Sequence, residues 1–186
     1  MASRTKPKAN GAATTAQQTE RRRLLVEAAR SCFLQFGFAK TSLDDIAKRA
    51  NISRPLIYRT FKNKEDIFAA VFEFTFEDRW PAAEKASKSR EPKKERLLRI
   101  YELLLIEPWE EISGGPMLDE YFDACERLIP KAEEKHARLQ LKYTQAVLGD
   151  RELSELFMLA ADGLTIDLPS TATLRRRLQL LVGRFV

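Results

Sequence analysis

The segment from Thr41 to Lys64, TSLDDIAKRANISRPLIYRTFKNK, constrains the fold of this chain more than any other part. It divides into two short stretches that each follow hydroxyl residues suited to capping a helix, Thr41 or Ser42 before the first and Ser53 before the second. Between them stands Asn51, a residue type that tolerates the positive φ of a tight turn. The pattern predicts a helix-turn-helix, a motif that lays its second helix in the major groove of DNA.

The second helix of this motif carries side chains suited to duplex DNA. Arginine can donate two hydrogen bonds to guanine, and a tyrosine hydroxyl can reach a phosphate. The lysines after the helix lie where phosphates would pass, and the start of the first helix offers free N–H groups and hydroxyls to the opposite groove wall. The expected DNA-binding residues are therefore Thr41, Ser42, Arg54, Pro55, Leu56, Tyr58, Arg59, Lys62 and Lys64.

Charge is distributed unevenly along the chain. Residues 1–66 hold 14 Lys and Arg against 6 Asp and Glu, whereas residues 67–186 hold 18 against 21. The balance is therefore +8 in the first third and −3 in the rest, which favours contact between the N-terminal end and a polyanion. An ordinary solvated surface is the alternative explanation of charge alone.

Apolar residues recur at helical spacing along most of the 186 residues, and only 7 Gly and 8 Pro interrupt them. We expect an all-α protein of about nine helices, with an N-terminal three-helix helix-turn-helix DNA-binding domain and a C-terminal helical bundle domain. The expected divisions are a disordered basic arm over 1–18, the DNA-binding domain over 19–66 and the second domain over 67–186. Within them, a first helix begins near Thr19 and is stopped by Gly37. A fourth helix ends near Trp80, residues 82–95 form a polar loop or frayed helix start, and Pro108 stops a fifth.

Several classes of function find little material in the sequence. His136 is the only histidine, Cys32 and Cys125 are far apart among apolar neighbours, and no Gly-rich phosphate loop is present. We therefore expect no catalytic residues, no metal and no cofactor. No apolar run approaches the length of a membrane span and the first residues lack the apolar core of a secretory signal, so a cytoplasmic protein without membrane contact is expected.

The first sixty or so residues resemble the tetracycline-repressor (TetR) family of bacterial transcription regulators. Two positions depart from the family pattern: Asn51-Ile52 replaces the usual Gly-Val of the turn, and Leu56 replaces a small or hydroxylated residue. Leucine cannot hydrogen-bond a base, so either apolar contact with a thymine methyl or mere exclusion of other groups is expected there. The resemblance is carried by Ala28-Ala29, Phe33, Phe36-Gly37-Phe38, Thr41-Ser42-Leu43, Ile46-Ala47, Ser53, Ile57-Tyr58 and Phe61-Lys62-Asn63-Lys64-Glu65.

The resemblance implies a homodimer that binds a palindromic operator in double-stranded DNA and is released by a small-molecule effector. The family pairs its last two helices across the two-fold axis, which implies a dimer interface of Leu156, Ala160, Leu164, Leu174, Leu178, Leu181 and Phe185. Packing of this stripe within one subunit is the alternative. An unidentified effector of hydrophobic or aromatic character is expected in a pocket drawn from Phe76, Trp80, Tyr101, Leu105, Trp109, Met117, Tyr121, Phe122, Cys125, Tyr143, Phe157 and Met158.

Two further hypotheses stand beside the ligand-responsive repressor. The chain could be a helix-turn-helix DNA-binding dimer without any effector, in which case its second domain should have a fully packed core. It could instead be a small helical enzyme, for which no nucleophile and base pair is evident.

Overall fold

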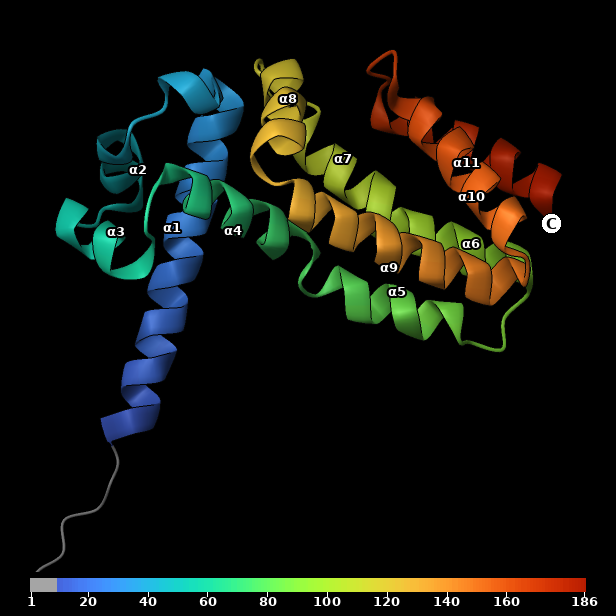
Figure 1. The fold of residues 1–186 in the computed structure, drawn as a ribbon, viewed down its shortest axis with the longest axis horizontal. Coiled ribbons are helices and arrows are strands. Elements are labelled where there is room, and N and C mark those ends of the chain that lie inside the picture. The colour runs from blue at the N-terminus through green and yellow to red at the C-terminus, as the bar shows by residue number, and fades with distance from the viewer. Residues whose placement is uncertain (1–9) are drawn as a thin grey trace, which may run out of the picture.

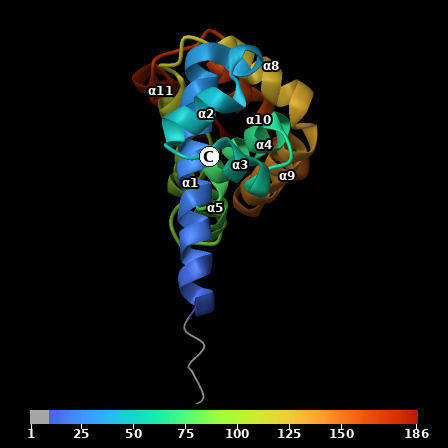
Figure 2. The same ribbon diagram turned by 90° about the vertical axis from the view of Figure 1, so that its left-hand side faces the viewer.

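The computed structural model describes residues 10–186, and the side chains of residues 17–186. All regular structure in this part is helical, which confirms the expected all-α class (Figure 1). At one end, α1 (Asn10–Lys40), α2 (Leu43–Ala50) and α3 (Arg54–Thr60) form a small three-helix unit. The long axis of α1 projects well beyond α2 and α3, as Figure 2 shows from the side of this unit.

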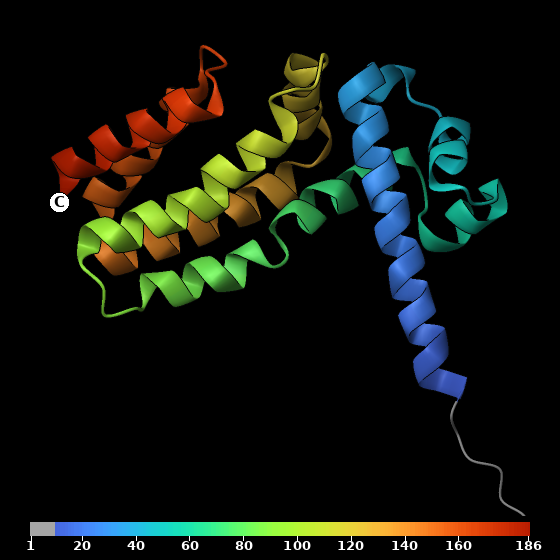
Figure 3. The ribbon, with the colours of Figure 1, turned by 180° about the vertical axis from the view of Figure 1, so that it is seen from behind.

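The remaining helices form the larger body of the molecule. It contains α4 (Lys64–Phe76), α5 (Arg79–Ser87), α6 (Lys93–Tyr101), the π-helical turn η1 (Glu102–Ile106), α7 (Glu107–Ile112), α8 (Leu118–Leu128), α9 (Pro130–Leu148), α10 (Arg151–Asp162), the short η2 (Gly163–Thr165) and α11 (Thr171–Phe185). α9 packs against α5, α6 and α10, and α11 packs against α6 and α10. α4 joins the two parts, because it packs on α1 at one side and on α8 and α9 at the other (Figure 3).

The helix-turn-helix is fixed by local signals. The Ser42 hydroxyl accepts a hydrogen bond from the Asp45 N–H, and the Asp45 carboxylate accepts from the Ser42 N–H at 2.9 Å, which forms a reciprocal capping box. Asn51 ends α2 in the left-handed region at φ 54° and ψ 45°, as its position predicted. Ile46 and Ile57 are completely buried beneath α1, so the turn geometry and the hydrophobic core both favour the same placement of α2 and α3.

Gly37 has a structural task at the junction of the two parts. Its φ of 79° and ψ of 162° are not helical, so α1 consists of two helical segments that meet in a kink at Gly37, and the first segment stops there as the sequence pattern predicted. A Cβ atom at this position would lie 1.7 Å from the Glu120 carboxylate, which accepts a hydrogen bond from the Ala39 N–H at 3.0 Å. Glycine therefore allows α8 to approach the end of α1 closely.

The start of α1 corrects the expected arm. The helix begins at Asn10, so residues 10–18 are helical and the predicted start near Thr19 is wrong. Alanine and glutamine predominate in this stretch, and extending a helix that is already nucleated gains one hydrogen bond for each residue fixed. Residues 1–9, which hold the first three basic side chains of the expected arm, lie outside the described residues.

Two other helix boundaries differ from the sequence predictions. α4 ends at Phe76, and α5 begins at Arg79 and occupies part of the predicted polar loop, so it is a helix that the sequence pattern missed. The fifth predicted helix does not stop at Pro108 but continues to Ile112. The π-helical turn before Pro108 explains this continuity: the Glu107 N–H bonds five residues back to Glu102, so the backbone widens before the proline, which has no N–H to donate.

Candidate DNA-binding surface and ligand cavity

α3 presents a row of uncovered side chains to solvent. Arg54, Pro55, Tyr58 and Arg59 are exposed, with Tyr58 at 52% of its full accessible area. Leu56 is partly buried, so only part of this leucine is available to a ligand. An exposed tyrosine and two arginines on one short helix form a surface that can reach both bases and phosphates.

Arg54 is held in place before any ligand binds. Its Nη1 donates to the Asp44 carboxylate of α2 at 3.2 Å, and its Nη2 lies 3.4 Å from the Tyr58 hydroxyl. All three groups are exposed, so this pairing contributes little to stability. The pairing does orient the Arg54 guanidinium along α3. From there the guanidinium can release the Asp44 carboxylate and bind a DNA base or phosphate instead.

Thr41 corrects the expected set of DNA-binding residues. It retains only 1% of its accessible area, and its hydroxyl donates to the Gly37 carbonyl at 2.6 Å, with the Cys32 carbonyl at 3.2 Å. Its N–H also bonds to Gly37. Thr41 therefore closes the end of α1 and has no group free for a phosphate. Ser42 is exposed, although its hydroxyl is already engaged in the capping box of α2.

Lys64 also has an internal task. Its Nζ donates to the carbonyls of Phe38 at 2.7 Å and Thr41 at 2.9 Å, and it lies 4.3 Å from the centre of the Phe38 ring. An ammonium group at the carbonyl end of a helix is favoured by the free acceptors there. The start of α4 is thereby tied to the end of α1, whereas the exposed Lys62 remains available to solvent.

A cavity of about 380 Å³ lies in the larger domain, between α4, the η1–α7 segment, α8, α9 and η2. This volume suits a small organic ligand. Half of the twelve residues predicted for an effector pocket line it, namely Phe76, Leu105, Trp109, Tyr121, Phe122 and Cys125.

The other half of the predicted pocket residues do not line this cavity. Tyr101 is completely buried, and its hydroxyl is 3.0 Å from that of Thr144, while Phe157 packs edge-on against its ring. Met117 lies near α1 and bonds through its N–H to Leu34. The residues that take no part in lining the cavity are Trp80, Tyr101, Met117, Tyr143, Phe157 and Met158.

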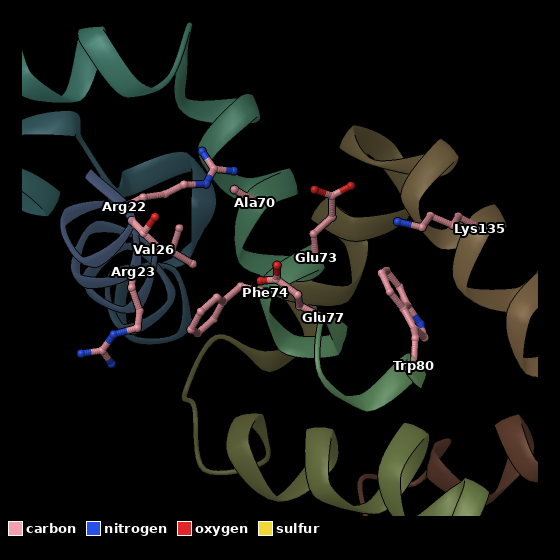
Figure 4. A pocket seen from close by; sticks show the side chains of 10 residues that line it. Arg22, Arg23, Val26, Ala70, Glu73, Phe74, Glu77, Trp80 and Lys135 are labelled. Atoms are coloured by element: carbon pink, nitrogen blue, oxygen red, sulfur yellow. The ribbon is translucent and has the colours of Figure 1, made fainter. Parts of the chain in front are cut away.

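Trp80 instead faces a second and separate hollow of about 450 Å³ between α1, α4 and α9 (Figure 4). Lys135 lies over its ring at 4.2 Å from the ring centre, and Glu73 and Glu77 project into the same hollow. Its walls also include Arg22, so charges of both signs are mixed there. This hollow borders the junction between the DNA-binding unit and the larger domain.

The polar residues in the walls of the cavity were not predicted from the sequence. Glu133 and His136, three residues apart on one face of α9, line it, as do Asp162, Thr75 and Thr165. Burial raises the pKa of the Glu133 and Asp162 carboxyls above their ordinary values, and burial lowers the pKa of His136 to about 4. The only sequence signal for these polar wall residues was the spacing of Glu133 and His136. This spacing places both side chains on one face of α9, a helix that also contributes residues to the core.

His136 should make stability depend on pH. The Trp80 Nε1–H donates to its Nδ1 at 3.2 Å, so protonating that nitrogen would set two donors against each other. Because its pKa falls from 6.5 to about 4 on folding, the folded protein binds fewer protons in this window. Stability is then lost as pH falls below the unfolded value, by about 2 kcal/mol between pH 7 and pH 5. Urea unfolding at both pH values measures this loss.

His136→Asn is the matched control, because it keeps an acceptor for Trp80 and does not titrate. The carboxyls of Glu133 and Asp162 are common to both proteins and cancel in the comparison. An equal loss of stability in the variant and the parent would contradict this role of His136.

The predicted dimer stripe needs a similar correction. Leu174 and Leu178 are fully buried within the chain, and Leu164, Leu181 and Phe185 pack partly against the same core. Leu156 is exposed as expected, and two leucines that the sequence did not single out are more exposed: Leu159 at 71% and Leu180 at 63%. One apolar face of α10 and α11 therefore packs within the core of its own subunit, and other leucines on these helices are exposed to solvent.

An exposed recognition helix at one end and a ligand-sized cavity in an all-helical body define a helix-turn-helix DNA-binding regulator. Residues 25–71 match the family model described as bacterial regulatory proteins, tetR family. This part of the chain is therefore similar to the DNA-binding part of TetR-family transcriptional regulators.

Two curated relatives each match part of the chain. The HTH-type transcriptional regulator YhgD of Bacillus subtilis is 38% identical over 73 residues, 39% of this chain and 37% of that protein. The probable acrEF/envCD operon repressor of Escherichia coli is 44% identical over 55 residues, 30% of this chain and 25% of that protein. The matched stretch thus spans between a quarter and somewhat more than a third of the length of these relatives.

Solved structures match over most of the chain. A complex of triclosan with SmeT, a Stenotrophomonas maltophilia repressor, has a TM-score of 0.67, covers 89% of this chain and 90% of its own, and is 19% identical. At this identity the likeness shows the shared fold. No helix among residues 10–186 is long and apolar enough to cross a membrane.

Proposed function

We propose that this protein is a dimeric repressor that leaves a palindromic operator when a small molecule enters the α4–α9 cavity. The observation that supports this proposal most is the position of α4. This helix lines the 380 Å³ cavity and also packs against the unit that holds the helix-turn-helix. Two names among its relatives support repression: the E. coli relative is a probable operon repressor, and SmeT represses a multidrug efflux pump. The SmeT complex with triclosan supports a small-molecule effector.

On DNA, the exposed side of α3 lies in the major groove. Arg54 and Arg59 donate to base edges, Tyr58 and Lys62 contact phosphates, and Leu56 with Pro55 meets thymine methyl groups. Ser42 lies toward the opposite wall of the groove. As a regulator of transcription, the protein acts in the bacterial cytoplasm.

α4 supplies the route by which a ligand changes DNA binding. Phe72 and Phe76 of α4 line the cavity, and Lys64 at its other end bonds to the carbonyls that close α1. A ligand that displaces the end of α4 near the cavity therefore moves the three-helix unit as well. Release requires the ligand to bind more tightly to the conformation that does not fit DNA.

The second candidate, a DNA-binding dimer without an effector, would be favoured by a fully packed larger domain. The cavity favours the first candidate. Selection of bound sequences from a random DNA pool tests the proposal for the DNA side, because a two-fold dimer should enrich inverted repeats whose half-sites are about one or more helical turns apart. Enrichment of single half-sites only, or of no sequence, would contradict it.

Removing one exposed cation should separate phosphate binding from base recognition. Lys62→Ala should weaken binding to specific and random DNA alike, and should lower the slope of log affinity against log salt by about 0.9 for each phosphate that is no longer neutralised. Arg54→Ala should instead reduce the preference for the selected operator over random DNA. Fluorescence anisotropy over a series of salt concentrations measures both quantities.

Lys94→Ala, at an exposed position of α6 far from α3, is the matched control and should leave affinity and salt slope unchanged. If Lys62→Ala and Lys94→Ala had the same affinity and the same salt slope, Lys62 would not be part of the DNA-binding surface.

A further inference from the structure

The walls of the α4–α9 cavity are acidic as well as apolar. Two carboxylates line it, Glu133 from α9 and Asp162 at the end of α10, and none of its described lining residues is a lysine or an arginine. Glu133 is partly buried, whereas Asp162 is more exposed and lies at the rim. A ligand in this cavity therefore meets negative charge with no basic side chain in the walls to offset it.

These two carboxylates have no partner in the part of the chain that the structure describes. Neither side chain takes part in an ion pair or hydrogen bond there, whereas some other acidic residues of the larger domain are paired. Glu107 and Glu111, for example, both contact Arg79. Loss of hydration at the cavity wall, without a partner, raises the pKa of both Glu133 and Asp162. A bound cation would restore the interaction that burial removes.

The third polar group of the wall does not supply that charge. Burial lowers the pKa of His136 to about 4, so its imidazole is neutral near pH 7. Its Nδ1 accepts from Trp80, which leaves Nε2 as the nitrogen that carries hydrogen. Tyr121 and Cys125, the other titratable groups of the wall, are neutral as well, because burial raises the pKa of both.

The rest of the wall is largely aromatic. Trp109 and Phe122 stack with their planes inclined by 17°, and Phe72 and Phe76 lie close together on α4. All four line the cavity together with Tyr121. Aromatic faces attract cations and also take up apolar rings, so the same walls suit both ends of an aromatic cation.

We infer that the ligand of this cavity is an organic monocation with an aromatic group, held by the unpaired carboxylates of Glu133 and Asp162 and by the aromatic walls. The inference rests on the proposed function, since it names the chemical class of the effector. A bare metal ion fits less well, because no group of three potential metal-ligating side chains occurs within the described residues.

Three benzyl ligands test the inference: benzyltrimethylammonium, its uncharged carbon analogue neopentylbenzene, which has nearly the same shape, and the smaller anion phenylacetate. Isothermal titration calorimetry with the full chain should show the cation binding at least about tenfold more tightly than the neutral analogue, with the anion weakest. Glu133→Gln and Asp162→Asn should each reduce this preference by about tenfold and leave the affinity for the neutral ligand unchanged.

Glu134→Gln is the matched control, because Glu134 is the exposed neighbour of Glu133 on α9 and does not line the cavity. Both cavity variants should fold, since replacing a carboxyl that burial disfavours removes a penalty. Equal binding of the cation and its neutral analogue, a preference for the anion, or no binding of any of the three overturns the cation assignment.

Failure of the wider proposal has a different signature. If the cation binds with the expected preference but does not reduce the affinity for the selected operator, the assignment of the ligand class stands and release by this effector fails. If the neutral ligand releases the operator as well as the cation does, effector release stands and the ligand class is wrong.

Discussion

Phe68→Ala should lower the free energy of unfolding by about 3–5 kcal/mol, among the largest losses that one substitution can cause in this protein. The Phe68 ring is completely buried, and its centre lies 5.2 Å from that of Phe33, 5.4 Å from that of Phe38 and 5.3 Å from that of Tyr121. These rings come from α1 and α8 as well as from α4. Alanine would leave a cavity where the DNA-binding unit meets the larger domain.

Phe74→Ala is the matched control for this prediction. It makes the same chemical change on the same helix, but Phe74 is only partly buried and faces the open hollow beside α1 (Figure 4). It should cost about 1 kcal/mol or less, because little volume is left empty. Urea denaturation followed by circular dichroism measures both variants, and equal losses would show that Phe68 does not hold the junction.

The helix-turn-helix could be predicted from sequence because its signals are local. A capping serine, an asparagine at the turn and a proline in the first turn of α3 act within a few residues of one another. Their meaning does not depend on distant parts of the chain. Asn51 accordingly has the positive φ that its position predicted.

Thr41 and Lys64 show where local reasoning ends. Both residues flank the motif at places that a DNA phosphate could approach, and both have polar groups that could bind a phosphate. In the folded chain, however, they bond to the carbonyls at the end of α1, up to 26 residues away in sequence from Lys64. A helix end that needs donors takes them from any nearby segment, and only the tertiary structure says which segment that is.

The cavity was half predicted for a related reason. An aromatic residue at helical spacing can line a cavity or fill the core, and the sequence pattern is the same in both cases. Phe76 and Trp109 reach the cavity, while Tyr101 and Phe157 pack against each other. Glu133 and His136 were missed because polar residues on an amphipathic helix usually face solvent.

The second large effect is expected at the exposed leucines of α10 and α11. Leu159→Glu should raise the dissociation constant of the proposed dimer by about a hundredfold or more, because each subunit would bring one uncompensated charge into an apolar interface. Two-fold symmetry repeats every substitution in the interface. Leu159 is 71% exposed in the single chain, so the change should leave the stability of the subunit nearly unaltered. Analytical ultracentrifugation over a range of concentrations measures the expected shift to monomer.

Leu24→Glu places the same charge at an exposed leucine of α1, far from α10, and should leave the oligomeric state unchanged. Leu180→Glu should act like Leu159→Glu if α11 contributes to the same interface. Operator binding is then an independent test of the dimer. A monomer can occupy only one half of an inverted repeat, and it lacks the high effective concentration of the second recognition helix, so it should bind the operator more weakly. A dimer that persists in Leu159→Glu would place the interface on another face of the subunit.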